Sequence, residues 1–302
     1  MDFCELAQND FVQNILRYLI RRLLNLGFEK MWRIPTFKAQ AHYKKALVYE
    51  DLYYRYFNST ASMMFKESSN PENFFGSVID ARKNAFFTAF LTSGVLLWED
   101  WLFYLDRHCF ETLDGAGLAI SGGKVVKLKF RLIPTPHGVL ITDVFSQTRK
   151  DGVHLGIDSI LFWNYLKIRK DFIERCNHAL DLGCGSGIHA MLLANLNPRL
   201  DIHCTDINGR ALACAQVNFL LNKNLFSAHV RFHRSNWFAS VPREPSGYDL
   251  ILCNPPFEYR SEGDEESCTI SAFGGGAYGT EETLRCWRKY HGFFLQRAWV
   301  SY

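Results

Sequence analysis

The sequence predicts an α/β protein in which a doubly wound parallel sheet follows an α-helical N-terminal domain and a β-hairpin. Three patterns lead to this prediction: helical spacing of apolar residues over the first hundred positions, an alternating period between about 124 and 145, and a strand–helix repeat from about 151 onward. Short apolar strands separated by helices are typical of a parallel sheet. We therefore divide the chain into residues 1–112, 113–150 and 151–302.

Composition limits the class of protein. A chain of 302 residues that is 48% hydrophobic can bury one large core or two smaller ones. Its nine cysteines include no C-x-x-C pair, which predicts buried free thiols, a reducing compartment such as the cytoplasm, and no metal site. The most apolar stretch, residues 85–98, is too short to cross a bilayer, so we expect no contact with a membrane.

The first hundred residues read as helices. Apolar residues recur at three- and four-residue spacing at Phe11, Ile15, Leu19, Leu23 and Leu26. Further helices are expected through the 40s and from about 73 to 104. Residues 13–49 hold eight basic residues against one acid: Arg17, Arg21, Arg22, Lys30, Arg33, Lys38, Lys44 and Lys45 against Glu29. This segment is either a solvated helix face or a contact surface for a polyanion such as RNA.

The period changes after residue 114. Residues 124–133 alternate between apolar and polar, residues 134–138 read as a turn, and residues 139–145 read as the partner strand of a hairpin. The alternation predicts that Lys127, Lys129 and Arg131 share the exposed face. Three cations there form either a second contact surface for phosphates or ordinary protection of a strand edge.

The strand–helix repeat supplies four strands before Phe257. They are predicted at His178–Gly183, Asp201–Asp206, His229–Arg234 and Tyr248–Cys253, with helices at Ile157–Lys170, Ile188–Ala194 and Arg210–Asn222. The chain stops at Tyr302, where a fifth strand is expected, so the sheet is expected to be cut short at the C-terminus with its fourth strand at or near an exposed edge. The glycine-rich residues 273–279 are either a loop that closes over a substrate or a flexible connection.

A glycine-rich turn follows the first of these strands. Residues 181–187 read D-L-G-C-G-S-G, and Gly183, Gly185 and Gly187 let the backbone turn tightly against a ligand at the start of a helix. Asp206 ends the second strand, where a carboxylate can accept hydrogen bonds from both hydroxyls of a ribose or can cap the next helix. Asn236, after the third strand, is placed to bind the edge of an adenine ring.

The strongest signal is the run Asn254-Pro255-Pro256-Phe257 directly after the fourth strand. Two successive prolines do not belong in a strand interior, and here they stiffen the loop. The amide of Asn254 and the carbonyl of Pro255 can accept the two protons of an NH2 group, while Phe257 stacks on the planar group that carries it. The run therefore predicts a grip for an amino nitrogen.

With these motifs, the segment from about 143 to 257 resembles the small-domain methyltransferases, Rossmann-like class I enzymes that depend on S-adenosylmethionine. The resemblance places the target at Asn254, Pro255, Pro256 and Phe257. It places the cofactor at the following residues: Asp181, Gly183, Cys184, Gly185, Gly187, Asp206, Ile207, Ser235, Asn236 and Asn254. Upstream, residues 144–146 and 151–156 resemble the ribosomal RNA guanine methyltransferases. Members with phenylalanine at the fourth motif position modify amines of guanine or adenine in RNA, whereas tyrosine is more frequent in glutamine and DNA-adenine enzymes.

The resemblance implies a methyltransferase acting on an exocyclic amino nitrogen of a base in RNA, with RNA as the partner. Two alternatives stay open. A helical domain ahead of the fold is also found in the enzymes that methylate glutamine in release factors, so a protein substrate is the first. The second is a binding or scaffold protein that keeps the fold but has lost turnover.

Overall fold

The structure of the protein is a computed structural model that describes residues 2–31, 81–92, 95–144, 151–255, 284 and 299–301. The chain forms two compact units, each described by itself. The first unit holds Asn9–Phe145, and the second holds Asp2–Gln8 together with Ser146–Tyr302. No helix in the described ranges is long and apolar enough to span a membrane.

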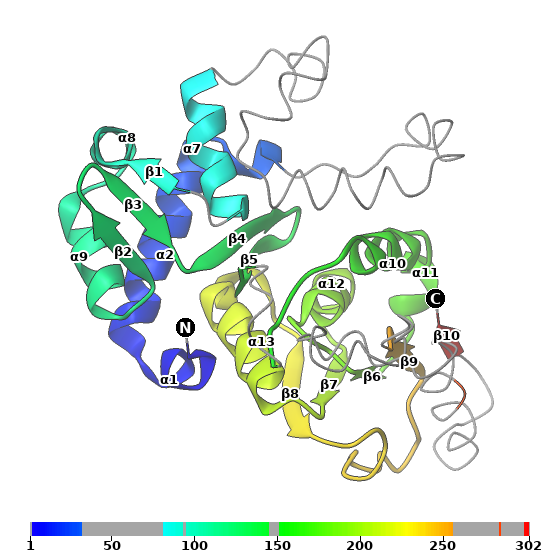
Figure 1. The fold of residues 1–302 in the computed structure, drawn as a ribbon. Helices are drawn as coiled ribbons and strands as arrows, with labels where there is room; N and C mark the ends of the chain where they lie inside the picture. Colours follow the sequence, from blue (N-terminus) through cyan, green and yellow to red (C-terminus); the bar gives the residue numbers. More distant parts are fainter. Residues whose placement is uncertain are drawn as a thin grey trace, which may run out of the picture. The chain divides into compact units, whose positions relative to one another are not determined.

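The first unit combines helices with two small antiparallel sheets (Figure 1). Its helices are α2 (Asp10–Asn25), the 3-10 helix η1 (Phe28–Met31), α7 (Ala81–Thr92), α8 (Trp98–Tyr104) and α9 (Arg107–Gly115). One sheet has the order β1-β3-β2, and the other is the hairpin β4–β5. Their strands are β1 (Val95–Leu97), β2 (Ala119–Gly122), β3 (Val125–Leu128), β4 (Phe130–Thr135) and β5 (Gly138–Asp143).

Aromatic rings fill the core of this unit. Phe86 and Phe90 lie edge to face with their centroids 5.3 Å apart, and Phe28 packs on Phe87 at 5.2 Å. The helical spacing of α2 was predicted correctly over most of its length. The helix begins after Asn9, its N-cap, whose side chain accepts a hydrogen bond from the Val12 amide. Phe11, however, is 61% exposed, because the buried stripe runs through neighbouring positions of the helix.

Two predictions for this unit were wrong. A single helix over 73–104 was expected, but α7 ends at Thr92, and β1 pairs with β3 before α8 begins. The predicted strand 124–133 is divided into β3 and β4, which belong to different sheets. In both places tertiary pairing overrides the local pattern, because a short run of apolar residues suits a helix or a strand equally well.

Arg131 is a further correction. Instead of lying on an exposed face, its side chain is fully buried, and its Nε donates a hydrogen bond of 2.6 Å to the carbonyl oxygen of Leu91 in α7. Alternation along a strand fixes which residues share a face, but it does not show whether a helix covers that face. All six residues of β4 are buried, so its second face is covered as well. Lys127 and Lys129 are exposed as predicted.

The second unit contains the predicted parallel sheet, with strand order β10-β9-β6-β7-β8 (Figure 1). Its strands are β6 (His178–Leu182), β7 (Asp201–Asp206), β8 (His229–Arg234), β9 (Leu250–Cys253) and β10 (Trp299–Ser301). Its helices are α1 (Phe3–Gln8), α10 (Ile157–Ile168), α11 (Lys170–Ile173), α12 (Ile188–Leu196), α13 (Gly209–Leu221) and the 3-10 helix η3 (Lys223–Leu225). The predicted α/β fold with a Rossmann-like sheet is confirmed.

The expected exposed edge at the fourth strand was wrong. β10 pairs in parallel with β9, with Trp299 opposite Ile251, so β9 lies between β10 and β6 and all four of its residues are buried. The segment before β9 adds cover, because Phe238, Val241 and Tyr248 pack against Leu180 and Ile251 in one apolar cluster.

Seven cysteines in the described residues are free thiols, and all of them except Cys4 are buried.

The strand order places β6 at the switch point of the sheet. The chain runs from β6 to β7 and β8 in one direction and then returns to β9 on the other side of β6. Ligands of such sheets bind outside the carboxyl ends of the strands at this point. Asp181, Asp206 and Asn254 all lie at or next to these ends.

Candidate functional site

The glycine turn after β6 is built as the sequence predicts. Gly183, Gly185 and Gly187 have φ angles of 76°, 54° and 80°, a left-handed backbone that residues with a side chain rarely adopt. The amides of Gly183 and Cys184 both donate to the carbonyl oxygen of Thr205, at 2.8 and 2.9 Å. These two bonds fasten the turn to the end of β7. Cys184 points into the core, since its side chain is buried.

Asp206 is held by backbone on both sides. Its Oδ2 accepts a hydrogen bond of 3.0 Å from the Gly185 amide, and its Oδ1 accepts one of 2.9 Å from the Asn208 amide. The Ile207 amide is a third backbone donor to this carboxylate. Because an ionised carboxylate offers about four acceptor positions, it retains capacity for a further donor. Burial raises the pKa of Asp206, against the opposing effect of these backbone hydrogen bonds. The next residue, Ile207, exposes 57% of its surface beside the carboxylate.

Ser235 and Asn236 form the next part of the site. The amide of Ser235 donates to the carbonyl oxygen of Asp206 at 3.0 Å, which ties the end of β8 to the end of β7. The Ser235 hydroxyl donates to the carbonyl of Trp237, a residue with a positive φ of 54°. This tight loop leaves the Asn236 side chain exposed next to the carboxyl edge of the sheet.

Asn254 follows β9, whose last residue Cys253 pairs with Leu182 of β6. Its side chain is half-buried, and its Nδ2 donates hydrogen bonds to Asp158 Oδ2 at 2.6 Å and to Ser159 Oγ at 3.4 Å. Pro255 is buried next to it. The other two residues of the motif, Pro256 and Phe257, lie outside the described residues.

Asp158, Ser159 and His189 were not predicted from the sequence. Asp158 and Ser159 open α10, and the Ser159 carbonyl accepts a hydrogen bond of 3.0 Å from Nε2 of the buried His189 in α12. A side chain at Gly156 would collide with the Asp158 carboxylate, so the glycine makes room for it. The only sequence signal for Asp158 and Ser159 was their place in the first turn of a predicted helix, just after Gly156. The same pattern is typical of an ordinary helix cap, so it did not indicate a functional site.

Asp181 is the buried acid of the site. Its side chain is 1% exposed and accepts a hydrogen bond from the Ala190 amide, but Oδ2 has no hydrogen-bond partner among the described residues. Burial raises its pKa from 3.8 to about 7. A buried carboxylate oxygen without a donor suits a cationic ligand group in the adjacent turn.

The raised pKa of Asp181 predicts a pH dependence of stability. Between pH about 4 and 7 the folded chain holds a proton that the unfolded chain has lost, so the free energy of unfolding falls as pH rises through this window. The slope is at most about 1.4 kcal/mol per pH unit. In urea unfolding without ligand, Asp181→Asn should therefore gain stability relative to the unsubstituted chain as pH rises from 4 to 8. A constant difference between the two chains over this range would show that the carboxyl does not titrate in this window.

A second prediction separates strain from packing in the glycine turn. A Cβ at Gly187 would lie 3.0 Å from the Cβ of Ala215 in α13, whereas one at Gly185 would meet nothing within 4 Å. Both glycines carry a positive φ, so both alanine substitutions incur about 1–2 kcal/mol of backbone strain. We expect Gly187→Ala to lower the free energy of unfolding by about 1–3 kcal/mol more than Gly185→Ala, because only the former overpacks α13. Equal losses in denaturant titrations would rule out the packing contribution.

Taken together, the turn, Asp206, the loop at Ser235 and Asn254 surround the carboxyl end of β6. Glycines admit backbone close to a ligand, Asp206 retains an acceptor for a hydroxyl group, and Asn254 offers an amide oriented by Asp158. The structure thus brings together the described residues that the sequence singled out. Among the described residues, one cluster of side chains that could hold a metal ion lies at the opposite end of the sheet; it consists of His178, Asp201 and Glu244.

Comparisons with known proteins identify a matching family model and several curated relatives. Residues 142–272 match the family model described as methyltransferase small domain. A curated relative, ribosomal RNA large subunit methyltransferase G of Shewanella oneidensis, is 38% identical over 81 residues, which cover 27% of this chain and 21% of that protein. Ribosomal RNA small subunit methyltransferase C of Shewanella halifaxensis is 33% identical over 159 residues, or 50% of this chain and 40% of that protein. The chain thus spans less than half the length of these relatives.

Solved structures with a similar fold include a SAM-dependent methyltransferase from Agrobacterium tumefaciens, with 20% identity and a TM-score of 0.35 over 47% of this chain and 48% of that one. The N-terminal domain of human METTL16 in complex with SAH has 21% identity and a TM-score of 0.27 over 37% of this chain and 49% of that one. Both scores are low, so the fold assignment depends on the sheet itself and on the family match.

Proposed function

We propose that this chain methylates an exocyclic amino nitrogen of a base in RNA, because residues 142–272 match the model of the methyltransferase small domain, whose cofactor is S-adenosylmethionine. The cofactor would be held by the glycine turn, Asp206 and the loop at Ser235, and the target by Asn254 and Pro255. The support is the geometry of these residues and the names of the relatives, which are ribosomal RNA methyltransferases.

The observation that carries the proposal is the orientation of the Asn254 amide. Its Nδ2 donates to Asp158, so its Oδ1 remains the acceptor that an incoming group meets. In our proposal this oxygen and the Pro255 carbonyl accept the two N–H groups of the target amine. Accepting both protons turns the nitrogen lone pair towards the methyl donor, so no general base has to remove a proton first. A hydroxyl or carbon target does not offer two such donors.

The residues around β6 fit the cofactor. Asp206 retains acceptor capacity for a ribose hydroxyl, and the exposed Ile207 and Asn236 lie where an adenine ring would follow. The partnerless Oδ2 of Asp181 suits a cationic part of the ligand. When bound, the cofactor supplies an electrophilic methyl group, and the task of the chain is to orient the amine towards it.

Asp158 acts in this proposal as a positioning residue for Asn254. Asp158→Ala removes the acceptor that fixes the amide, so we expect kcat to fall about 10- to 100-fold while the Kd of the cofactor stays unchanged. Asp158→Asn retains an acceptor oxygen and should recover most of the rate, and Ser159→Ala should cost less because its contact is longer. A uniform loss of cofactor affinity in these variants would point to a structural role instead. Steady-state kinetics measures kcat, and calorimetry measures the Kd of the cofactor.

RNA as the substrate class is supported by exposed cations. Three of the predicted cations are exposed and can contact phosphates: Arg21 in α2, and Lys127 and Lys129 just before the hairpin. Arg131 is buried and Arg17 is half-buried, so these two are less accessible to RNA than the sequence predicted. The remaining basic residues of the predicted contact segment, from Arg33 to Lys45, lie outside the described residues. Arg22 donates to the Tyr104 carbonyl, so Arg21 is the cleaner site for a charge reversal. Affinity for RNA should fall with salt and weaken in Arg21→Glu.

The test of the proposal is transfer of a labelled methyl group to fractionated cellular RNA and protein. Incorporation into RNA supports the proposal. Incorporation into protein alone favours glutamine as the target, and cofactor binding without transfer to either fraction favours a scaffold.

A further inference from the structure

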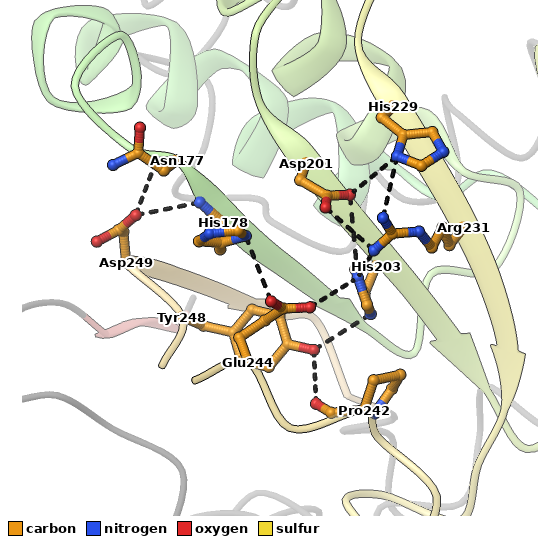
Figure 2. A network of polar contacts seen from close by, with 10 residues as sticks. All are labelled: Asn177, His178, Asp201, His203, His229, Arg231, Pro242, Glu244, Tyr248 and Asp249. Carbon is orange, nitrogen blue, oxygen red and sulfur yellow. Dashed lines mark hydrogen bonds and ion pairs between the residues drawn. The ribbon is translucent and has the colours of Figure 1, made fainter. Parts of the chain in front are cut away.

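A network of polar side chains lies at the amino ends of β6, β7 and β8, opposite the edge that carries the glycine turn (Figure 2). His178 and Asp201 are the first residues of β6 and β7, and Glu244 comes from the segment that leads to β9. The proposed function assigns no role to these residues. They are mostly buried, with side-chain exposures of 28%, 20% and 15%.

Each of these three side chains directs one atom that could bind a metal towards the same small space. His178 offers a ring nitrogen and the two acids offer carboxylate oxygens, all within 4.8 Å of one another, and His178 Nδ1 lies 3.7 Å from Glu244 Oε2. His178 Nδ1 and Asp201 Oδ1 are both buried, and within the described part of the chain neither has a hydrogen-bond partner. Folded proteins rarely leave such atoms unsatisfied, and an unplaced ion is one recognised cause.

We propose that His178, Asp201 and Glu244 bind a divalent transition-metal ion, with Zn²⁺ as the best fit, which clamps the amino ends of β6 and β7 to the segment before β9. An imidazole nitrogen and two carboxylate oxygens are ordinary zinc ligands. Donors about 2.1 Å from a metal can be up to ~4.2 Å apart, so small side-chain adjustments bring these atoms into range.

The surrounding hydrogen bonds leave the carboxylates available. Tyr248 donates its hydroxyl proton to the Pro242 carbonyl, so it accepts from His203 Nδ1 at 3.2 Å. His203 Nε2 is then the acceptor for Arg231 Nη1 at 2.7 Å. In this arrangement it has no proton to give to Glu244 Oε1, which lies 3.2 Å away.

The charge balance points the same way. Asp201 and Glu244 contribute two carboxylates, and Arg231 binds only Oδ2 of Asp201, at 3.0 Å, leaving Oδ1 facing the shared space. His229, 3.6 Å from Asp201 Oδ1, is largely exposed. His233 stacks on His203, with their ring centroids 5.0 Å apart. A divalent cation compensates the carboxylate charge that Arg231 does not neutralise.

The sequence did not indicate this site. Its ligands are far apart in the chain, and the expectation of no metal was drawn from the spacing of the cysteines. Parallel strands bring their amino ends together only in the folded sheet, so the ligands become neighbours through β6–β7 pairing, in which His178 lies opposite Asp201.

Titration of the metal-free chain with ZnCl₂ in a calorimeter tests the proposal. We expect one ion per chain, with affinity reduced at least about tenfold in His178→Ala and in the isosteric Glu244→Gln. His108→Ala, at an exposed histidine of α9, is the matched control and should bind as the unsubstituted chain does. Saturating Zn²⁺ should raise Tm by about 5 °C or more in the unsubstituted chain and much less in both variants.

Two outcomes overturn the proposal. One is the lack of saturable Zn²⁺ binding in the unsubstituted chain. The other is binding that His178→Ala and Glu244→Gln leave unchanged while circular dichroism shows both variants folded. Should His178→Ala fail to fold, Glu244→Gln decides the matter, because it keeps the size of the side chain. None of these readouts requires methyl transfer, so the result is independent of the proposed function.

Discussion

Asn254→Ala should lower kcat for methyl transfer about 10²- to 10³-fold while the Kd of S-adenosylmethionine changes by less than about twofold. The substitution removes the amide oxygen that, in our proposal, accepts a proton of the target amine as its lone pair turns towards the methyl group. It leaves Asp206 and the glycine turn untouched, so the cofactor keeps its contacts. Single-turnover transfer and calorimetry measure the two effects separately.

Asn224→Ala is the matched control for this experiment. Asn224 is exposed in η3, away from the carboxyl edge of β6, and its substitution should change neither quantity. A variant at Asn254 that keeps full kcat would remove the central residue from the mechanism. Loss of kcat together with loss of cofactor binding would instead indicate that the loop after β9 had collapsed.

Asp206→Ala should weaken S-adenosylmethionine binding roughly a hundredfold or more. A hydrogen bond from a ribose hydroxyl to an ionised carboxylate contributes about 1.5–3 kcal/mol, and it is lost. The substitution also frees the amides of Gly185 and Asn208, which loosens the turn that faces the cofactor. Asp206→Asn retains one acceptor oxygen, so its affinity for the cofactor should lie between those of Asp206→Ala and the unsubstituted chain.

Calorimetric titration of the cofactor measures this loss, with Asp171→Asn as the control because Asp171 is exposed in α11. Urea unfolding of each variant shows whether the chain is still folded under the conditions of the titration. If Asp206→Ala binds the cofactor as the unsubstituted chain does, the carboxylate only holds the backbone at Gly185 and Asn208 and the proposed ribose contact is wrong.

Much of the second unit could be predicted from the sequence, because local signals and the fold agree there. Strands β6, β7 and β8 are short apolar or alternating runs, each bounded by a turn or a helix start, and they lie within one residue of the expected positions. The rule that parallel strands share one carboxyl edge then brings Asp206 and Asn254 to the same side without knowledge of the structure.

The remaining features depend on contacts that a single sequence does not display. Arg131 is buried because α7 covers the second face of β4, and β9 is an interior strand because β10 pairs with it. The bond from Asn254 to Asp158 joins positions that are distant in the chain. A polar residue at a helix start is usually only a cap, so nothing in the local pattern marks Asp158 as a partner of the amide.

The most direct test of the central claim is to identify the methylated atom. Cellular RNA methylated by this chain with a labelled cofactor is digested to nucleosides and analysed by mass spectrometry. Our account predicts that the label lies on an exocyclic amino nitrogen of guanine or adenine and disappears with Asn254→Ala. Label on a ribose hydroxyl, a ring carbon or a protein glutamine would contradict it.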